Sequence, residues 1–170
     1  MALYRTPLKP IADSPKTYSA KLYELGDVLR REQRDSLLNR KLVIPGLSRV
    51  ESGGDVQLEL VINPFAITQK EVRDVPLETT NNGQKVTIHQ YSYLLHCSFP
   101  MKLRVMVQGR LLAENDLPGA FTKDYTPQNR NSLEAMQREF DQDYHFQGRL
   151  VSDRLEEHGK YLKDMLASEY

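Results

Sequence analysis

The apolar residues of this sequence change their period part-way along the chain. From Val56 to Asn115 they recur at every second position, and from Leu133 to Met165 they recur at every third or fourth position. Alternation is typical of an antiparallel sheet with one buried face, whereas the longer spacing is typical of an amphipathic helix. The sequence therefore predicts an α+β fold: a mixed, mainly antiparallel sheet of about six strands, a helix after the first strand, and long C-terminal helices on one face.

Proline content and helix-start signals divide the chain into three expected parts. Residues 1–16 contain three prolines, which predicts an extended lead-in. Residues 17–125 carry the strand pattern and form the expected sheet domain. Thr126 can cap a helix and Pro127 suits its first turn. Residues 126–170 are therefore expected to be a helical segment that packs on the sheet or extends from it.

Two helical regions follow from local signals. Asp27 suits the N-cap of a helix that runs to about Asn39, and a short strand over 42–44 is expected after it. The C-terminal pattern would need a single helix of roughly 60 Å. Because such a helix outreaches a domain of this size, we expect two helices with a break between His145 and Gly148.

The dipeptide Asn82–Gly83 predicts a tight β-hairpin turn, because both residues tolerate positive φ angles. In the strand that follows, Val86 and Ile88 share one face, whereas Tyr91 and Tyr93 share the other. A strand places alternate side chains on opposite faces. The change of phase between Ile88 and Tyr91 therefore predicts a β-bulge or a strand that leaves one sheet for another.

Composition excludes several classes of protein. The 23 basic residues balance the 23 acidic ones, so we expect neither a nucleic-acid partner nor an anionic membrane partner. Cys97 is the only cysteine, which rules out an intramolecular disulfide. No apolar run approaches the length of a membrane span. The start, Met1 to Pro7, lacks the features of a signal peptide.

The sequence contains no recognisable catalytic, metal-binding or phosphate-binding motif. His89 and His96 lie seven residues apart in one strand, and this odd spacing places them on opposite faces. His145 and His158 lie too far apart for a helical ligand pair. Cys97 is expected to be a small core residue rather than a nucleophile. We therefore expect a protein that is not an enzyme and that uses no metal or cofactor.

Two sets of side chains are candidates for binding. Tyr91, Tyr93 and Leu95, beneath Phe140 and Tyr144, would form the wall of a pocket between sheet and helix. Alternatively, they cover the sheet under the C-terminal helix. A second set forms the apolar stripe of that helix and would be the surface used for self-association; it consists of Val151, Leu155, Leu162 and Met165.

An order of features between Asn39 and Asp164 resembles an uncharacterised family of exported proteins from Bacteroidetes-type bacteria. The features are Lys-Leu-Val-Ile-Pro-Gly-Leu at 41–47, the alternating strand 56–62, the Asn82–Gly83 hairpin, a Tyr-rich strand that ends in Phe-Pro-Met-Lys-Leu at 99–103, a turn at Gly109 and two amphipathic stretches. The resemblance implies a periplasmic or cell-surface domain, cut from a longer chain whose precursor carries a signal peptide; without that peptide the protein would be cytoplasmic. It implies no activity and no catalytic residue.

Two functions remain open. The first is a protein-interaction or scaffolding domain without enzymatic activity, which binds a protein partner or a second copy of itself as a dimer. The second is a small-molecule binder whose C-terminal helix closes an apolar cavity over the sheet, as in helix-grip folds. A sheet and helix that pack without a cavity would exclude the second function.

Overall fold

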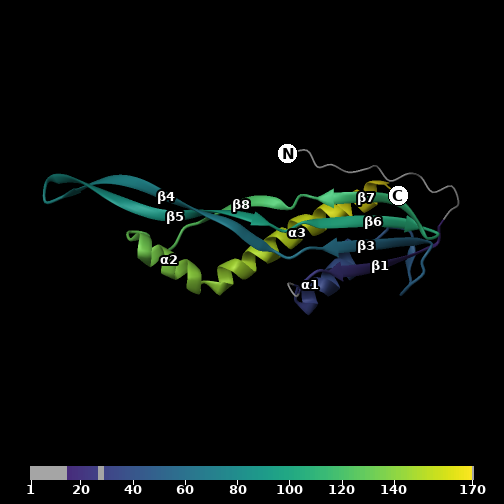
Figure 1. Cartoon of the computed structure of the whole chain (residues 1–170). Helices are drawn as coiled ribbons and strands as arrows, with labels where there is room; N and C mark the ends of the chain where they lie inside the picture. Colours follow the sequence, from purple (N-terminus) through teal and green to yellow (C-terminus); the bar gives the residue numbers. More distant parts are fainter. Residues whose placement is uncertain (1–14, 27–28, 170) are drawn as a thin grey trace. The chain divides into compact units, whose positions relative to one another are not determined.

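The computed structural model describes residues 15–26 and 29–169. Figure 1 shows the ribbon with its helices and strands labelled. In chain order the elements are β1 (Thr17–Glu24), α1 (Arg31–Ser36), η1 (Leu37–Lys41), β2 (Ser48–Arg49), β3 (Val56–Ile62), β4 (Ala66–Asn81), β5 (Gln84–Ser98), β6 (Met101–Val107), β7 (Arg110–Leu117), β8 (Ala120–Tyr125), α2 (Leu133–Gln142) and α3 (Tyr144–Glu169).

The predicted α+β fold is confirmed, although the strands form two sheets rather than one. The chain forms two compact units, each built from separate segments. Unit 1 contains the described residues up to Phe65, then Phe99–Gly119, then those from Val151 onwards; unit 2 contains Ala66–Ser98 and Ala120–Leu150. The predicted division into a lead-in, a sheet domain and a helical segment stays a prediction.

Unit 1 contains a five-stranded sheet in the order β2-β1-β3-β6-β7. β1 runs parallel to both of its neighbours, while β3–β6 and β6–β7 are antiparallel pairs. The parallel β1–β2 pair needs a crossover between its strands, which α1 and η1 provide. Antiparallel β6 and β7 are joined by a tight turn at Gln108 and Gly109, both of which have positive φ.

The core of unit 1 lies on one face of this sheet. Every second residue of β3 is buried, as the alternation from Val56 to Ile62 predicted. Further buried side chains come from the same face of β6 and from the C-terminal part of α3, and include Met101, Leu103, Val105, Leu155, Leu162, Met165 and Leu166. The other face is polar: Lys102 and Arg104 of β6 form ion pairs with Glu114 of β7.

Unit 2 contains a three-stranded sheet in the order β4-β5-β8, with α2 and the first turns of α3. β4 and β5 form the long hairpin that Asn82–Gly83 predicted, and both turn residues have positive φ. In Figure 1 this hairpin is a twisted two-stranded ribbon. Only the part of β5 from Tyr93 to Ser98 pairs with β8. The rest of the hairpin therefore has two strands only.

The predicted irregularity between Ile88 and Tyr91 is wrong. β5 pairs with β4 in continuous register from Gln84 to His96, and the register shift between these two strands lies between Ile67 and Gln69 of β4. The change of phase has another cause, because β5 presents apolar side chains on one face near α2 and on the opposite face nearer the turn.

Three local expectations also need correction. Helix α2 begins at Leu133 rather than near Thr126, because Ser132 is its N-cap and the Ser132 hydroxyl accepts a hydrogen bond from the Ala135 N–H. The break between the two C-terminal helices lies at Asp143. Residues 42–44 form no strand, although Leu42 and Ile44 are buried. Asp27 lies outside the described residues, and the N-cap of α1 is Arg30.

Candidate functional site

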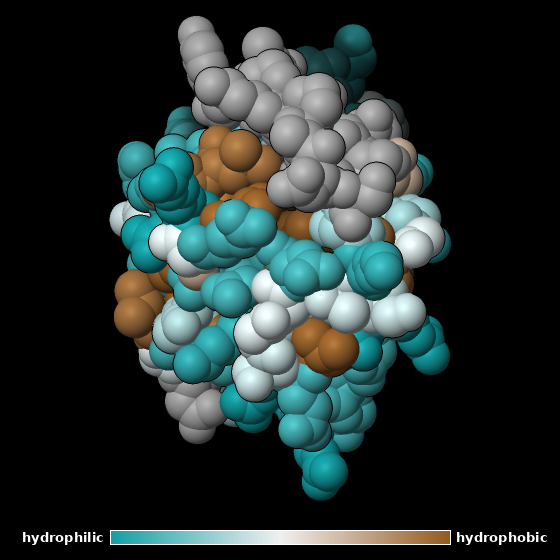
Figure 2. All heavy atoms as spheres, turned by 90° about the vertical axis from the view of Figure 1, so that its right-hand side faces the viewer, coloured by the Kyte–Doolittle hydropathy of each residue, from teal (hydrophilic) through white to brown (hydrophobic). Residues whose placement is uncertain are grey.

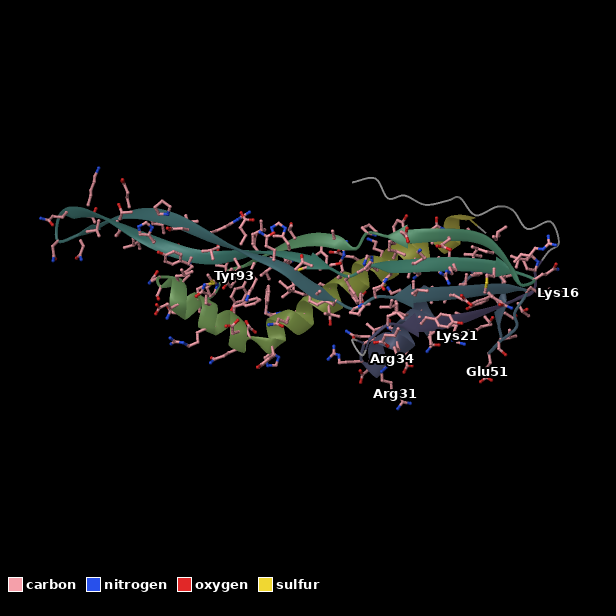
Figure 3. All side chains as sticks on the ribbon, in the orientation of Figure 1. Lys16, Lys21, Arg31, Arg34, Glu51 and Tyr93 are labelled. Carbon is pink, nitrogen blue, oxygen red and sulfur yellow. The ribbon has the colours of Figure 1, made fainter. Side chains whose placement is uncertain are left out.

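A cluster of aromatic rings occupies the position predicted for the pocket. Tyr93 points from β5 towards α2 (Figure 3), and its ring centroid lies 5.2 Å from that of Phe140. The Tyr125 ring lies 4.9 Å from Phe140 and 4.7 Å from Phe146. These edge-to-face contacts are favourable aromatic packing. Rings, rather than an open cavity, therefore fill the space between α2 and this part of β5.

The phenol groups of this cluster are held in their neutral form. Burial raises the pKa of Tyr93. Burial and then the carboxylates of Glu139 and Asp143 raise the pKa of Tyr125, and the Tyr125 hydroxyl donates a hydrogen bond to Glu139 Oε2 at 3.3 Å. The ammonium of Lys70 covers the cluster, 5.8 Å from the Tyr93 ring centroid and 5.5 Å from that of Phe140. The aromatic cluster is therefore a packed core, and the Lys70 ammonium lies over it.

The other residues predicted for the pocket lie in different environments. Leu95 is buried on the same face of β5 as Tyr93. Tyr91 is half-buried, and its ring stacks on that of His89 with centroids 6.4 Å apart. Tyr144 is 77% exposed, so it forms no wall. The structure therefore brings together Tyr93 and Phe140, with Leu95 buried on the same face of β5, but it does not add Tyr144.

The stripe that we predicted for self-association is not a free surface. Leu155, Leu162 and Met165 are buried in the core of unit 1, and Val151 is half-buried. The sequence pattern marked the correct face of α3. That face of α3 is buried because the apolar face of the five-stranded sheet is stabilised by packing against an apolar helix face.

The buried reactive groups of the chain serve packing. His158 is buried, and its Nε2–H donates a hydrogen bond to the Phe99 carbonyl at 3.2 Å. Burial, followed by the nearby Arg154 guanidinium, lowers the pKa of His158 to about 4. Cys97 is also buried, and burial raises the pKa of its thiol. Within residues 15–26 and 29–169, no cluster of three or more His, Cys, Asp or Glu side chains is placed to hold a metal ion.

The most distinctive surface lies on the hairpin beyond the end of β8. Leu77 of β4 lies directly opposite Ile88 of β5, with Val75 beside Leu77 and Val86 beside Ile88 on the same face. We call these four residues the outer strip. Val75 is 49% exposed, Leu77 and Val86 are each 40% exposed, and Ile88 is 38% exposed. Single exposed apolar residues are common, but four neighbours on one face form a continuous patch.

The opposite face of the same ribbon is polar. It presents Asp74 and Glu78 of β4 beside His89 and Thr87 of β5. Nδ1 of His89 lies 2.8 Å from Oδ1 of Asp74. Polar residues on one face and apolar residues on the other are typical of a strand pair with one buried face. Here the apolar face is exposed, and this is the signal behind the change of phase in the sequence.

A shallow polar groove adjoins the outer strip within unit 2. Its volume is about 280 Å³, and its lining includes Val75, Gln90, Ser92 and Arg130. Arg73 also lines it and forms an ion pair with Asp124 at 3.4 Å. The outer strip therefore has a polar border at one end, an arrangement that protein interfaces commonly share.

Two grooves in the described part of unit 1 are each lined by both positive and negative side chains. One, of about 250 Å³, lies beside α1 and includes Lys41 and Glu156. The other, of about 420 Å³, includes Lys21 and Glu51, which Figure 3 labels. In the view of Figure 2, apolar side chains occur as separate patches among hydrophilic ones. Neither of these two grooves favours a ligand of one charge.

Comparisons with known proteins identify no family and no functional residues for this chain. No family model matches the sequence, and no curated protein matches it. One similar solved structure is that of a protein described as a homologue of the neuraminyllactose-binding hemagglutinin from Helicobacter pylori. It is 11% identical, with a TM-score of 0.32 over 96% of this chain and 99% of the other. No helix in the described ranges is long and apolar enough to cross a membrane.

Proposed function

We propose that this protein is a non-enzymatic protein-interaction domain and that the outer strip of the β4–β5 hairpin is its docking surface. The observation that carries the proposal is that the apolar face of the ribbon is exposed instead of buried. It consists of Val75, Leu77, Val86 and Ile88. A two-stranded ribbon is marginally stable by itself in water. A partner that covers the apolar face supplies the burial that the ribbon lacks.

The aromatic cluster weighs against the alternative function as a small-molecule binder. That function needs an apolar cavity between α2 and β5. Tyr93 and Phe140 instead meet at a centroid separation of 5.2 Å, and Met136 of α2 is fully buried. The binding surface of this protein is accordingly assigned to the hairpin and not to the space beneath α2.

We further propose that the protein acts outside the cytoplasm, in the periplasm or at the cell surface. The support for this is the order of sequence features between Asn39 and Asp164, which resembles exported proteins. Fractionation of the native host with an antibody against this chain tests the proposal. Recovery of the protein in the cytoplasmic fraction alone would contradict it.

Site-specific photo-crosslinking tests the proposed function. A benzophenone amino acid replaces Leu77 on the outer strip, and in a matched variant it replaces Glu78, the next residue, on the polar face. We expect protein adducts in native-host cells from position 77 and few from position 78. The Leu77→Lys substitution, combined with a probe at Val75, is expected to abolish the adducts. Equal labelling from both faces, or no adduct at position 77, would contradict a docking role for the outer strip.

A further inference from the structure

In the described part of the chain, the edge of β5 that faces away from β4 is unpaired over residues 84–90, beside Val86 and Ile88 of the outer strip. Among the described residues, no strand pairs with this edge over Gln84–Gln90. The Tyr91 N–H donates a hydrogen bond to the Arg130 carbonyl at 2.6 Å, on the side of β5 where β8 lies. Backbone groups of a strand alternate between its two edges. The N–H and C=O groups of His89, Thr87 and Lys85 therefore point towards this same open edge.

The cross-strand partner of His89 supports this assignment independently. His89 lies opposite Pro76 of β4, and proline has no N–H to donate. A proline within a ladder is tolerated where its nitrogen faces outwards, on an edge strand. Pro76 therefore faces the outer edge of β4, and the backbone groups of His89 face the outer edge of β5. Of the two edges of the ribbon, that of β4 is interrupted by proline, whereas that of β5 is not.

We infer that this edge of β5 pairs with the same edge of a second copy of the chain, in an antiparallel register centred on Thr87. The inference rests on the proposed function, whose docking surface it widens by joining the outer strips of two copies. In this register Thr87 meets Thr87 of the second copy, and their backbone groups face each other as a hydrogen-bonded pair. An isologous contact of this kind closes by twofold symmetry.

Self-complementarity is the reason to assign a second copy rather than another partner. With Thr87 on the twofold axis, Val86 lies opposite Ile88 of the second copy, and Ile88 lies opposite its Val86. Both residues belong to the outer strip, so the two strips merge into one apolar face across the new pair. Cross-strand contacts between β-branched side chains stabilise such a pair.

The charges on this edge are compatible with self-pairing. Residues 84–90 contain Lys85 and His89 but no Asp or Glu, so no two carboxylates face each other across the pair. Lys85 lies opposite His89 of the second copy, and each His89 has the Asp74 carboxylate beside it at 2.8 Å. That carboxylate offsets the cationic character of the contact.

The interface is short, and this sets the strength of the expected dimer. A seven-residue strand spans about 23 Å at 3.3 Å per residue. Pairing over this length falls at the small end of specific interfaces. The dimer is therefore expected to dissociate on dilution, with a dissociation constant in the micromolar range.

Sedimentation measurements on the full chain test the inference. We expect the mass to rise from 19.6 kDa towards twice that value with increasing concentration. Thr87→Pro removes an N–H at the centre of the free edge and is expected to leave a monomer. The matched control is Glu78→Pro, because Glu78 lies opposite Thr87 and faces the other edge of the ribbon. We expect the Glu78→Pro variant to dimerise like the original chain.

Disulfide trapping tests the register without a proline. In a Cys97→Ala background, Thr87→Cys places two thiols across the twofold axis, with Cα atoms about 5.5 Å apart, which is suitable for a disulfide. Lys85→Cys places them about 14 Å apart along the strands and serves as the control. We expect rapid oxidation to a covalent dimer at position 87 and none at position 85.

The two proposals fail in different ways. A chain that stays monomeric at all concentrations, or a Thr87→Cys variant that does not cross-link, overturns the β5 pairing. Persistence of the dimer in a folded Thr87→Pro variant also overturns it. If the probe at position 77 still labels a protein in any of these cases, the docking role of the outer strip stands and only the β5 pairing is contradicted.

Discussion

Nε2 of His158 lies 3.2 Å from the carbonyl oxygen of Phe99, in the buried core of unit 1. The folded chain holds this imidazole neutral, because burial lowers its pKa to about 4. In the unfolded chain, a histidine side chain such as that of His158 has its ordinary pKa of about 6.5. Between pH 6.5 and 4 the unfolded state therefore binds more protons, and stability falls as the pH falls. The loss is on the order of 3 kcal/mol, because each pKa unit corresponds to about 1.4 kcal/mol.

The His158→Gln variant isolates this contribution. Its amide N–H can still donate to the Phe99 carbonyl, but glutamine does not titrate. We expect the variant to lose less stability than the original chain when urea unfolding is measured at pH 7 and again at pH 4.5. Parallel losses in both chains would show that His158 titrates normally in the folded state.

Phe140→Ala is expected to destabilise unit 2 strongly. Phe140 contacts the rings of Tyr93 and Tyr125, and its removal leaves a cavity that costs about 3–5 kcal/mol. The sequence has no tryptophan, so tyrosine fluorescence can follow the unfolding of this cluster in urea. Tyr144→Ala, at a position that is 77% exposed, is the control and should change stability by about 0.5 kcal/mol or less. Similar effects at both positions would contradict the packing described for the cluster.

Cys97 is expected to be unreactive in the folded protein. Its thiol is buried, and burial raises its pKa, so little of the reactive thiolate is present near neutral pH. The reaction with a disulfide reagent such as DTNB at pH 8 should be slow in buffer and fast in urea. A cysteine placed at Tyr144, whose side chain is 77% exposed, provides the fast reference. Rapid reaction of Cys97 in buffer would indicate that unit 2 opens readily.

Gly54→Ala is expected to destabilise unit 1, because a Cβ at this position would lie 2.5 Å from the backbone carbonyl carbon of Tyr18. Backbone must move to relieve this clash, at a cost of about 2 kcal/mol. Gly148→Ala is the matched control: Gly148 lies in α3 with no atom within 4 Å of the added Cβ. Alanine there should raise stability by about 1 kcal/mol. Thermal unfolding of both variants measures the contrast, and a stable Gly54→Ala protein would contradict the close approach.

The sequence predicts the elements of this fold better than it predicts their surroundings. The strand from Val56 to Ile62 could be identified because one of its faces is buried and the other is polar. The turn at Asn82–Gly83 could be identified because its backbone angles restrict the residue types. Thr126 and Pro127 carry the signal of a helix start, yet the chain continues without a helix until Ser132 caps α2. A local signal of this kind does not reveal which of several possible caps the tertiary structure uses.

The candidate site was hidden for a related reason. The alternation of Val86 and Ile88 predicts an apolar face but does not say whether anything covers it. The change of phase before Tyr91 would indicate a bulge, or a strand that passes from one sheet to another, only if the apolar side chains on both faces were buried. We made that assumption in predicting the irregularity. The structure keeps β5 regular and leaves the second apolar face exposed. Exposure depends on where β8 and α2 end along the hairpin, which no local pattern in β5 encodes.

The discontinuous composition of unit 1 has a consequence for its biosynthesis. β1 and β3 leave the ribosome before unit 2, whereas the stretch from Val151 onwards, which belongs to the same core as β1 and β3, is translated after unit 2. Domains that draw on distant segments cannot complete their folding until the last segment is available. The apolar face of β3 therefore has no helical cover while the whole of unit 2 is being synthesised. Nascent chains that stop before Val151 should be bound by chaperones and cleaved by proteases, and the emergence of the stretch from Val151 onwards should end both.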